Sequence, residues 1–167
     1  MKALFIGRFQ PFHLGHLKFL KNVYGDYDEI IIGIGSSQLD NTPDNPFSAD
    51  ERRMMVEKSL GGEEIKNYKI IFIPDINNYP KWVAHVVSIV PNFDVVVSSN
   101  PLTMQLFDEK GYAVRTVPVF NKKLYSGKEI RRRMVQNETW ENLVPKPVVQ
   151  IIKNISGVKR LKTLCKN

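Results

Sequence analysis

Apolar residues along this chain fall into short, dense runs. The clearest run, Glu29–Gly35, is rich in β-branched residues and has no polar alternation. Such a run is typical of a strand that helices cover on both faces of a parallel sheet. The apolar runs predict five strands, at Lys2–Gly7, Glu29–Gly35, Tyr68–Ile73, Asp94–Ser98 and Tyr112–Val119.

The stretches between these runs repeat their apolar residues at helical spacing, for example at Leu17 and Leu20. In two of them a serine is followed three residues later by a glutamate, at Ser48–Glu51 and Ser126–Glu129, which is the pattern of a capping box at a helix start. We predict helices at His16–Val23, Ser48–Leu60, Lys81–Val90, Pro101–Lys110, Ser126–Gln136, Val148–Ile155 and Val158–Lys166.

Strands and helices alternate through most of the chain, and only helices are predicted at its end. Connections of the strand–helix–strand kind are right-handed crossovers, which build a doubly wound α/β fold around a parallel sheet. The 167 residues suit a single domain, and no internal repeat or linker divides them. The pattern therefore predicts one α/β domain over residues 1–167, a doubly wound parallel sheet with C-terminal helices.

The composition indicates the cellular compartment and, through the net charge, the kind of partner. The single cysteine, Cys165, excludes an intrachain disulfide, and the N-terminal residues lack the pattern of a signal peptide. No apolar run approaches the ~18–20 residues that span a bilayer. These features predict a cytoplasmic protein with no membrane partner. With 24 Lys and Arg against 17 Asp and Glu, the net charge of +7 favours anionic partners such as nucleotides, phosphates or nucleic acid.

The loop after the first predicted strand concentrates residues that suit a phosphate ligand. It contains Gly7, Arg8, His13, Gly15 and His16 within ten residues, just before a predicted helix. In open parallel sheets, ligands bind beyond the carboxyl ends of the strands, and the N–H groups of a helix start attract phosphate. A lone histidine is more often structural than catalytic, but the convergence of these five residues predicts a functional site. A metal site is not expected there, because no third His, Cys or carboxylate lies at ligand spacing.

Two other glycine-containing stretches do not match phosphate-binding motifs. Gly33–Gln38 has the first two glycines of the dinucleotide fingerprint but lacks the third, and it follows the second strand rather than the first. Ser126–Glu129 has a Gly-Lys pair, but it lacks the earlier glycine and the following hydroxyl of a P-loop. The loop Gly7–His16 is therefore the main candidate.

Gly7–His16 contains the HxGH signature of the nucleotidyltransferase superfamily, and Tyr125–Arg131 resembles that superfamily's second signature. The resemblance implies a Rossmann-like nucleotidyltransferase fold. The chain has Lys128 where the second signature often has threonine, and Asp44 where some relatives carry a basic residue. Further stretches resemble the archaeal-type nicotinamide mononucleotide adenylyltransferases, so that the similarity covers nearly the whole chain: Asn45–Arg52, Trp82–Val83 and Ser99–Leu102.

The reaction that this resemblance implies is adenylyl transfer. The phosphate of nicotinamide mononucleotide (NMN) attacks the α-phosphorus of ATP to give NAD and pyrophosphate, and no protein nucleophile is needed. His13 and His16 fit as donors to phosphate oxygens, and Arg8 and Arg131 suit the β- and γ-phosphates because a planar guanidinium can bond two oxygens. Mg²⁺ is expected to arrive with ATP rather than in a dedicated protein cage.

The resemblance also assigns residues to the two halves of the site. For ATP and NAD, the binding residues are Gly7, Phe9, Gln10, Gly15, Gly35, Ser36, Asn100, Tyr125 and Ser126. For the acceptor NMN, they are Phe47, Asp75, Ile76 and Trp82. Trp82 is the candidate stacking partner of the cationic nicotinamide ring, and a core position on an amphipathic helix is its alternative. The family further implies a homo-oligomer.

Two other functions stay open from the residues alone. The HxGH signature reports only on the nucleotide half, so the acceptor could be phosphopantetheine, flavin mononucleotide or another phosphorylated compound. The charge of +7 and the triplet Arg131–Arg133 would also suit a non-enzymatic nucleic-acid-binding module. Against that module, the aromatic residues do not interleave with the basic clusters as a base-stacking platform requires. We therefore expect ATP and NMN as partners, and no nucleic acid.

Overall fold

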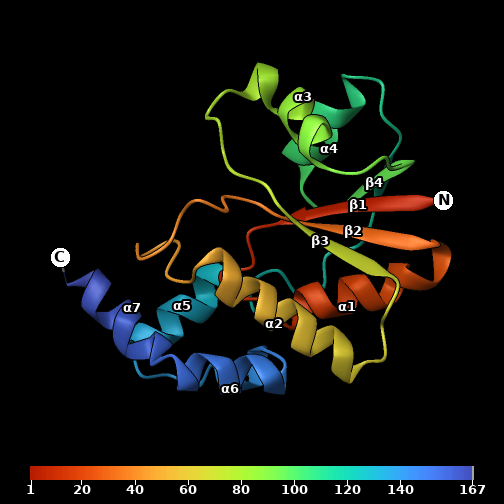
Figure 1. Cartoon of the computed structure of the whole chain (residues 1–167). Coiled ribbons are helices and arrows are strands. Elements are labelled where there is room, and N and C mark those ends of the chain that lie inside the picture. The colour runs from red at the N-terminus through yellow and green to blue at the C-terminus, as the bar shows by residue number, and fades with distance from the viewer. Residues whose placement is uncertain (167) are drawn as a thin grey trace.

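Five parallel strands form one sheet in the order β3-β2-β1-β4-β5 in the computed structural model, which describes residues 1–166 (Figure 1). The pairings between neighbouring strands are all parallel. The strand order reverses between β1 and β4, which confirms the predicted doubly wound α/β sheet. The strands are β1 (Lys2–Gly7), β2 (Glu29–Ile34), β3 (Tyr68–Phe72), β4 (Val95–Ser98) and β5 (Val114–Thr116).

Helices cover both faces of this sheet. Figure 1 shows α3 and α4 on one face, and α1, α2 and the C-terminal helices α5, α6 and α7 on the other. None of the helices within residues 1–166 is long and apolar enough to cross a membrane. The helices are α1 (Leu14–Val23), α2 (Ala49–Gly62), α3 (Tyr79–Ile89), α4 (Pro101–Asp108), α5 (Gly127–Val135), α6 (Lys146–Asn154) and α7 (Gly157–Cys165), with short 3₁₀ turns at Tyr24–Asp26 and Glu141–Leu143.

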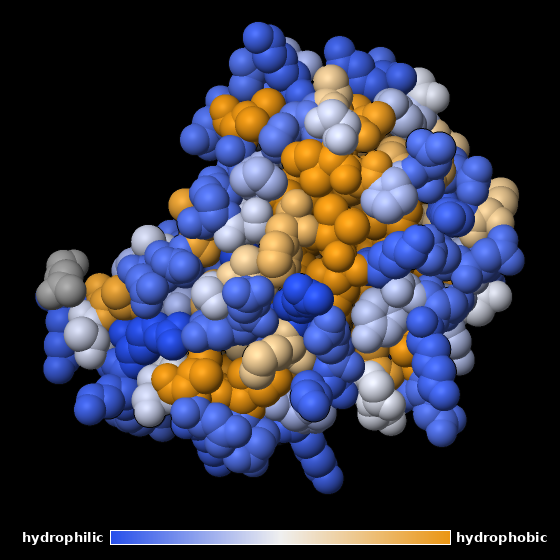
Figure 2. Space-filling view, in the orientation of Figure 1, coloured by the Kyte–Doolittle hydropathy of each residue, from blue (hydrophilic) through white to orange (hydrophobic). Residues whose placement is uncertain are grey.

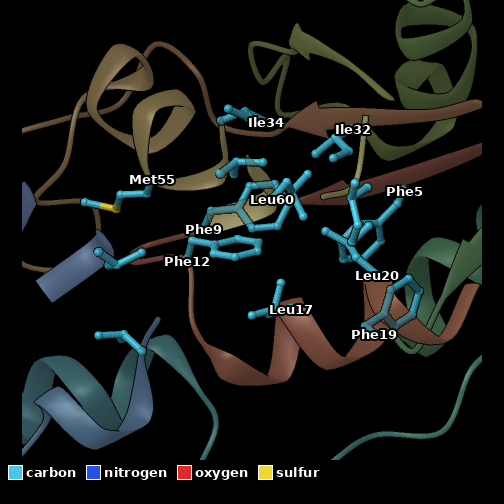
Figure 3. Packing of buried hydrophobic residues seen from close by; sticks show 14 of the residues in the cluster. Phe5, Phe9, Phe12, Leu17, Phe19, Leu20, Ile32, Ile34, Met55 and Leu60 are labelled. Atoms are coloured by element: carbon cyan, nitrogen blue, oxygen red, sulfur yellow. The ribbon is translucent and has the colours of Figure 1, made fainter. Parts of the chain in front are cut away.

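The two faces of the sheet carry separate apolar layers, because successive strand residues point to opposite sides. On one face, Phe5 and Ile32 pack with residues of α1 and α2, as Figure 3 shows, and Phe9 and Phe12 join this layer. On the other face, Leu4 and other residues pack against α3 and α4. The larger layer therefore extends under the loop that follows β1.

The strand β5 is shorter than the sequence predicts. It spans Val114–Thr116 instead of Tyr112–Val119. The N–H of Val117 still bonds the carbonyl of Ser98 at 3.1 Å. The next residue is Pro118, which has no N–H to extend the ladder along β4. The chain leaves the sheet at that point and continues toward α5.

The two predicted capping boxes have different outcomes. The one at α2 is complete, since Ser48 and Glu51 each accept the other's main-chain N–H. At α5 only half of the box forms: Ser126 Oγ accepts the N–H of Glu129 at 3.1 Å. The carboxylate of Glu129 bonds Arg132 and Arg133 instead. The prediction of a second full box was therefore wrong, because the neighbouring arginines compete for the glutamate.

Candidate active site

A cavity of about 380 Å³ opens at the carboxyl ends of β1 and β4, where the strand order reverses. This is the place at which open parallel sheets bind ligands. Eight of the predicted site residues line it: Gly7, Arg8, His13, Gly15, His16, Asn100, Tyr125 and Ser126. Segments that are far apart in the sequence therefore form one wall.

Three helices begin at this cavity. His13, Asn100 and Ser126 are the N-caps of α1, α4 and α5, and all three line the cavity wall. The free N–H groups and the positive dipole end of each helix start favour an anion. Arg8 and Lys122 add positive side chains to the same wall. The cavity is therefore suited to a polyphosphate.

The two imidazoles of the HxGH stretch cap the helix and each other. The N–H of His16 donates to Nδ1 of His13 at 3.3 Å, and the N–H of His13 donates to Nδ1 of His16 at 3.2 Å. The two rings stack with centroids 3.6 Å apart and planes 19° apart. Because both Nδ1 atoms accept, the ring proton of each neutral imidazole is on Nε2.

Burial keeps these imidazoles neutral. It lowers the pKa of His13 to about 3. The pKa of His16 also lies well below its ordinary value, mainly because of burial and further because of the neighbouring His13 ring. Both groups are therefore neutral Nε2–H donors near neutral pH.

Gly15 allows this stack to lie against the α5 side of the cavity. A Cβ atom at Gly15 would be 2.9 Å from the His13 ring and 2.9 Å from Cβ of Tyr125. Gly127 is equally restricted, since a Cβ there would be 2.7 Å from Nη1 of Arg131 and 2.9 Å from the carbonyl oxygen of Gln10. Side chains at these two positions would push the walls of the cavity apart.

Three of the predicted contact residues are buried behind the cavity. Phe9 has a left-handed backbone (φ 54°) and packs its ring edge-on against His16, with centroids 4.8 Å apart. The side-chain amide of Gln10 bonds both the N–H and the carbonyl of Phe47, at 3.0 and 2.9 Å. The ring of Phe47 is fully buried in the core. These side chains hold the loop in place; the ring of Phe47 packs in the core, and its assignment to the acceptor stays a prediction.

The two predicted phosphate-binding arginines differ in exposure. Arg8 is exposed at the cavity, and its Nη1 lies 3.5 Å from Oδ1 of Asn45. Arg131 is buried and donates from Nη1 to the carbonyl of Gln10 at 2.7 Å. Its Nη2 lies 3.8 Å from Asp44, in an adjoining hollow of about 230 Å³. Burial, and then the charge of Arg8, lowers the pKa of Arg131, so the two cations influence each other.

The remaining predicted residues lie outside the cavity wall. Gly35 and the buried Ser36 follow β2, and Asp75 and Ile76 follow β3. Both stretches are at the carboxyl edge of the sheet: the one after β2 is next to the end of β1, and the one after β3 is one strand farther away. Trp82 is half-buried on α3, with its ring edge-on to Phe107 at a centroid distance of 5.6 Å.

Sequence reasoning missed several residues that shape this region. Ser98 ends β4 and Ser99 follows it; both line the cavity, and their place at the carboxyl end of a predicted strand was a usable signal. Phe120 and Lys122 line it from a loop that carries no motif. Arg52 is fully buried on α2; it ends the stretch Asn45–Arg52 that resembles the family, and its helical spacing from Ser48 and Met55 places it on the inner face.

Comparisons with known proteins agree with this geometry. The family model described as cytidylyltransferase-like matches residues 4–133. The nicotinamide-nucleotide adenylyltransferase of Thermococcus kodakarensis is 50% identical over 168 residues, covering 99% of this chain and 89% of that protein. Its counterpart in Pyrococcus horikoshii is 50% identical, with 100% and 90% covered. The one in Thermoplasma volcanium is 47% identical, with 98% and 92% covered.

Solved structures show the same fold at lower identity. A bifunctional NMN adenylyltransferase/ADP ribose pyrophosphatase of Francisella tularensis, complexed with AMP and a manganese ion, has a TM-score of 0.79 at 24% identity. Another structure of this bifunctional protein has a TM-score of 0.81 at 22% identity. Each match covers 97% of this chain and 52% of the other, so the chain spans about half of that bifunctional protein.

Proposed function

The chain belongs to the cytidylyltransferase-like family, and from this premise we infer that it catalyses the reaction for which its archaeal relatives are named, nicotinamide-nucleotide adenylyl transfer. It is a transferase that moves AMP from ATP to NMN and so makes NAD and pyrophosphate. The observation that carries this function is identity of 47–50% to these enzymes over almost the whole chain. The anion-binding cavity supports it independently.

The reaction exchanges one bond for another at the α-phosphorus. An oxygen of the NMN phosphate forms a bond to the α-phosphorus of ATP. The bond from that phosphorus to the oxygen bridging the β-phosphorus breaks, and pyrophosphate leaves with its electron pair. Such a transfer is accelerated mainly by alignment and by donors placed where negative charge develops.

His13 and His16 supply donors for the transferring phosphate. As neutral Nε2–H groups in the cavity wall, they donate to its oxygens without being consumed as acids. Arg8 and Arg131, with the starts of α1 and α5, hold the β- and γ-phosphates and the leaving pyrophosphate. Arg8 lines the cavity and its charge acts on Arg131, which supports placing an anion near both groups.

The acceptor takes the other half of the site, beyond β2 and β3. Asp75 and Ile76 are on this side, and Trp82 lies in the first turn of the helix that follows, α3. Gly35 and Ser36, which the resemblance assigns to ATP and NAD, lie at the end of β2 between the two halves. The accessible part of the Trp82 ring stacks on the nicotinamide, whose positive charge is attracted to an indole face. This placement separates the acceptor from the triphosphate while both reach the end of β1.

Mg²⁺ enters with the triphosphate in this proposal. Within residues 1–166, no three His, Cys, Asp or Glu side chains are grouped to hold a metal ion. The described lining of the cavity is neutral or cationic, which suits phosphate oxygens rather than a resident divalent ion. The ion would shield the charge of the phosphates, and no step of the protein's own chemistry is assigned to it.

A panel of acceptors tests the function. The purified chain is incubated with ATP, Mg²⁺ and one acceptor at a time: NMN, nicotinic acid mononucleotide, phosphopantetheine or flavin mononucleotide. We expect the fastest pyrophosphate release with NMN, and NAD as the product identified by mass. Faster pyrophosphate release with phosphopantetheine or flavin mononucleotide would mean that this compound, and not NMN, is the acceptor. Binding of a labelled oligonucleotide with no pyrophosphate release from any acceptor would favour a nucleic-acid-binding module.

A further inference from the structure

Residues 35–39, here called the connector, join the ends of three strands. The connector follows β2, which lies between β1 and β3 in the sheet. The N–H of Gly35 donates to the carbonyl of Gly7 at 2.9 Å, on the cavity side. The N–H of Ser37 donates to the carbonyl of Ile73 at 3.2 Å, on the side of β3. The connector therefore spans the distance between the loop Gly7–His16, here called the phosphate loop, and the segment after β3 that is assigned to the acceptor.

Arg52 fixes the cavity end of the connector. Its side chain is fully buried, and each of its five hydrogen bonds goes to a main-chain carbonyl. Nη1 bonds the carbonyls of Arg8 and Gly35, both at 2.9 Å. Nη2 bonds those of Ser36 and Leu39, at 3.2 and 3.3 Å. Nε bonds the Ser48 carbonyl at 3.2 Å. One guanidinium thus joins the connector, the phosphate loop and the start of α2.

Burying a guanidinium that is bonded only to carbonyls costs free energy, because a carbonyl has no net charge to balance that of the cation. Burial is the largest cause that lowers the pKa of Arg52, to about 10, and the charge of Arg8 is the next. Removing a cation from water requires compensation, and here it comes from three stretches of main chain. The arrangement is stable only when those carbonyls converge, so the guanidinium fixes their relative positions.

Gln38 fixes the acceptor end of the connector. Its Oε1 accepts the N–H of Asp75 at 3.0 Å. On the other side of the same segment, Nε2 of His85 lies 2.7 Å from the carbonyl oxygen of Pro74 and donates to it. Gln38 is exposed and His85 is half-buried, so neither is needed to fill the core. The segment after β3 is held from two sides by side-chain hydrogen bonds.

We propose that the connector, clamped by Arg52 and linked to Asp75 by Gln38, sets the position of the acceptor relative to the α-phosphate of ATP. Arg52 and Gln38 are then positioning residues for the transfer, acting through the main chain. The inference rests on the proposed function, because it takes the segment after β3 as the acceptor side. A misplacement of ~1 Å between reacting groups can cost ~100-fold in rate, so a rigid connection has catalytic value.

Gln38→Ala provides the first test, because the side chain is exposed and its loss should leave the fold intact. We expect the KM for NMN to rise about three- to tenfold, while the KM for ATP stays within about twofold of wild type. Gln150→Ala on α6 is the matched control, since it also removes an exposed glutamine hydrogen bond, to Asn154 at 3.0 Å. An unchanged KM for NMN in Gln38→Ala, or an equal change in Gln150→Ala, would overturn the proposal.

Arg52→Lys provides the second test. An ammonium keeps the charge but has three donors instead of five in a planar fork, so at least two of the carbonyls lose their partner. At a temperature where circular dichroism shows the variant folded, we expect kcat to fall at least about tenfold and the KM for NMN to rise. Wild-type kcat and KM in the folded variant would show a purely structural role. If the variant does not fold, Gln38→Ala decides alone.

The two proposals fail in different ways. Wild-type turnover with NMN tests the function, whereas the ratio of variant to wild-type KM tests the connector. If the wild type prefers another phosphorylated acceptor, the same ratio measured with that acceptor still tests the connector. A high KM confined to ATP in Gln38→Ala would place the linked segment on the nucleotide side and overturn the inference while leaving the function intact.

Discussion

His13 occupies the N-cap of α1, a position where Ser, Thr, Asp or Asn are usual. Its Nδ1 accepts the N–H of His16, and Nδ1 of His16 accepts the N–H of His13 in return. This exchange satisfies two N–H groups at the helix start. It also leaves Nε2–H of both rings for the cavity. One local structure therefore starts the helix and sets the tautomer of two side chains.

Protonation of this pair should destabilise the protein in mild acid. Burial lowers the pKa of His13 to about 3, whereas an unfolded chain has a histidine pKa of ~6.5. Between these values the unfolded state binds the extra proton, so stability falls as the pH drops, by at most ~1.4 kcal/mol per pH unit for this group. His13→Asn keeps a capping acceptor without titrating. Its urea unfolding free energy should depend less steeply on pH between ~6.5 and ~5; a wild-type slope would contradict this account.

His16→Ala should lower kcat by more than ~100-fold while ATP binding changes little. The donor contact strengthens as the α-phosphate becomes pentacoordinate, and one such donor typically contributes ~3–4 kcal/mol to the transition state. Steady-state kinetics give kcat, and calorimetric titration with a non-reacting ATP analogue gives the affinity. Turnover near that of the wild type would remove His16 from the mechanism.

Residue identity explains which parts of the site could be predicted. His16 and Gly15 are informative because their chemistry and spacing point to phosphate before any fold is known. Arg52 is not, because its five partners are carbonyls, which every residue has and which only the fold brings together. Phe47 shows that membership of a motif does not tell where a side chain lies: it belongs to the stretch Asn45–Arg52, but its ring is in the core.

At the scale of elements, the sequence predicts the type and order of the strands and helices better than their ends. The buried run of β2 is apolar throughout and is found almost as expected. The length of β5 depends on how far its neighbour β4 offers hydrogen bonds, and the two pair over three residues. Pro118 marks the C-terminal limit within the predicted run itself, whereas the N-terminal limit at Val114 depends on where β4 begins to pair and is not encoded in the β5 residues.

The helix α3 carries Trp82, the residue that we propose contacts the acceptor. Trp82 packs edge-on against Phe107, and part of its surface stays accessible. Attraction between an indole and a partly desolvated cation is ~1–2 kcal/mol, so Trp82→Ala should raise the KM for NMN about five- to thirtyfold while the KM for ATP barely moves. Steady-state kinetics with each substrate varied in turn measure both constants.

Trp82→Phe is the matched control for this substitution. It keeps a ring next to Phe107 but presents a weaker π-face to a cation, so its KM for NMN should lie between those of the wild type and the alanine variant. Equal changes in both KM values, or no change in either, would assign Trp82 to the core. The acceptor assignment would then rest on the relatives alone.

At the scale of the whole molecule, we expect a homo-oligomer, as the family resemblance implies. Figure 2 shows apolar side chains gathered in the middle of one face. The edge strand β3 has partly exposed apolar residues, and Ile76 and Tyr79 beyond it are exposed. Exposed apolar patches and free sheet edges are commonly covered by another chain. Light scattering after size exclusion should give a multiple of 19.2 kDa, and a mass of 19.2 kDa at micromolar concentration would contradict the expectation.

The bond from Arg131 to the Gln10 carbonyl joins positions 121 residues apart. During synthesis, all five strands exist once Thr116 has been added, but the wall made by Tyr125, Ser126 and the start of α5 comes later. A nascent chain at that stage has its imidazoles and no closed cavity around them. We therefore expect competence to hold ATP to be acquired late, so that copies ending before Tyr125 would not sequester the nucleotide.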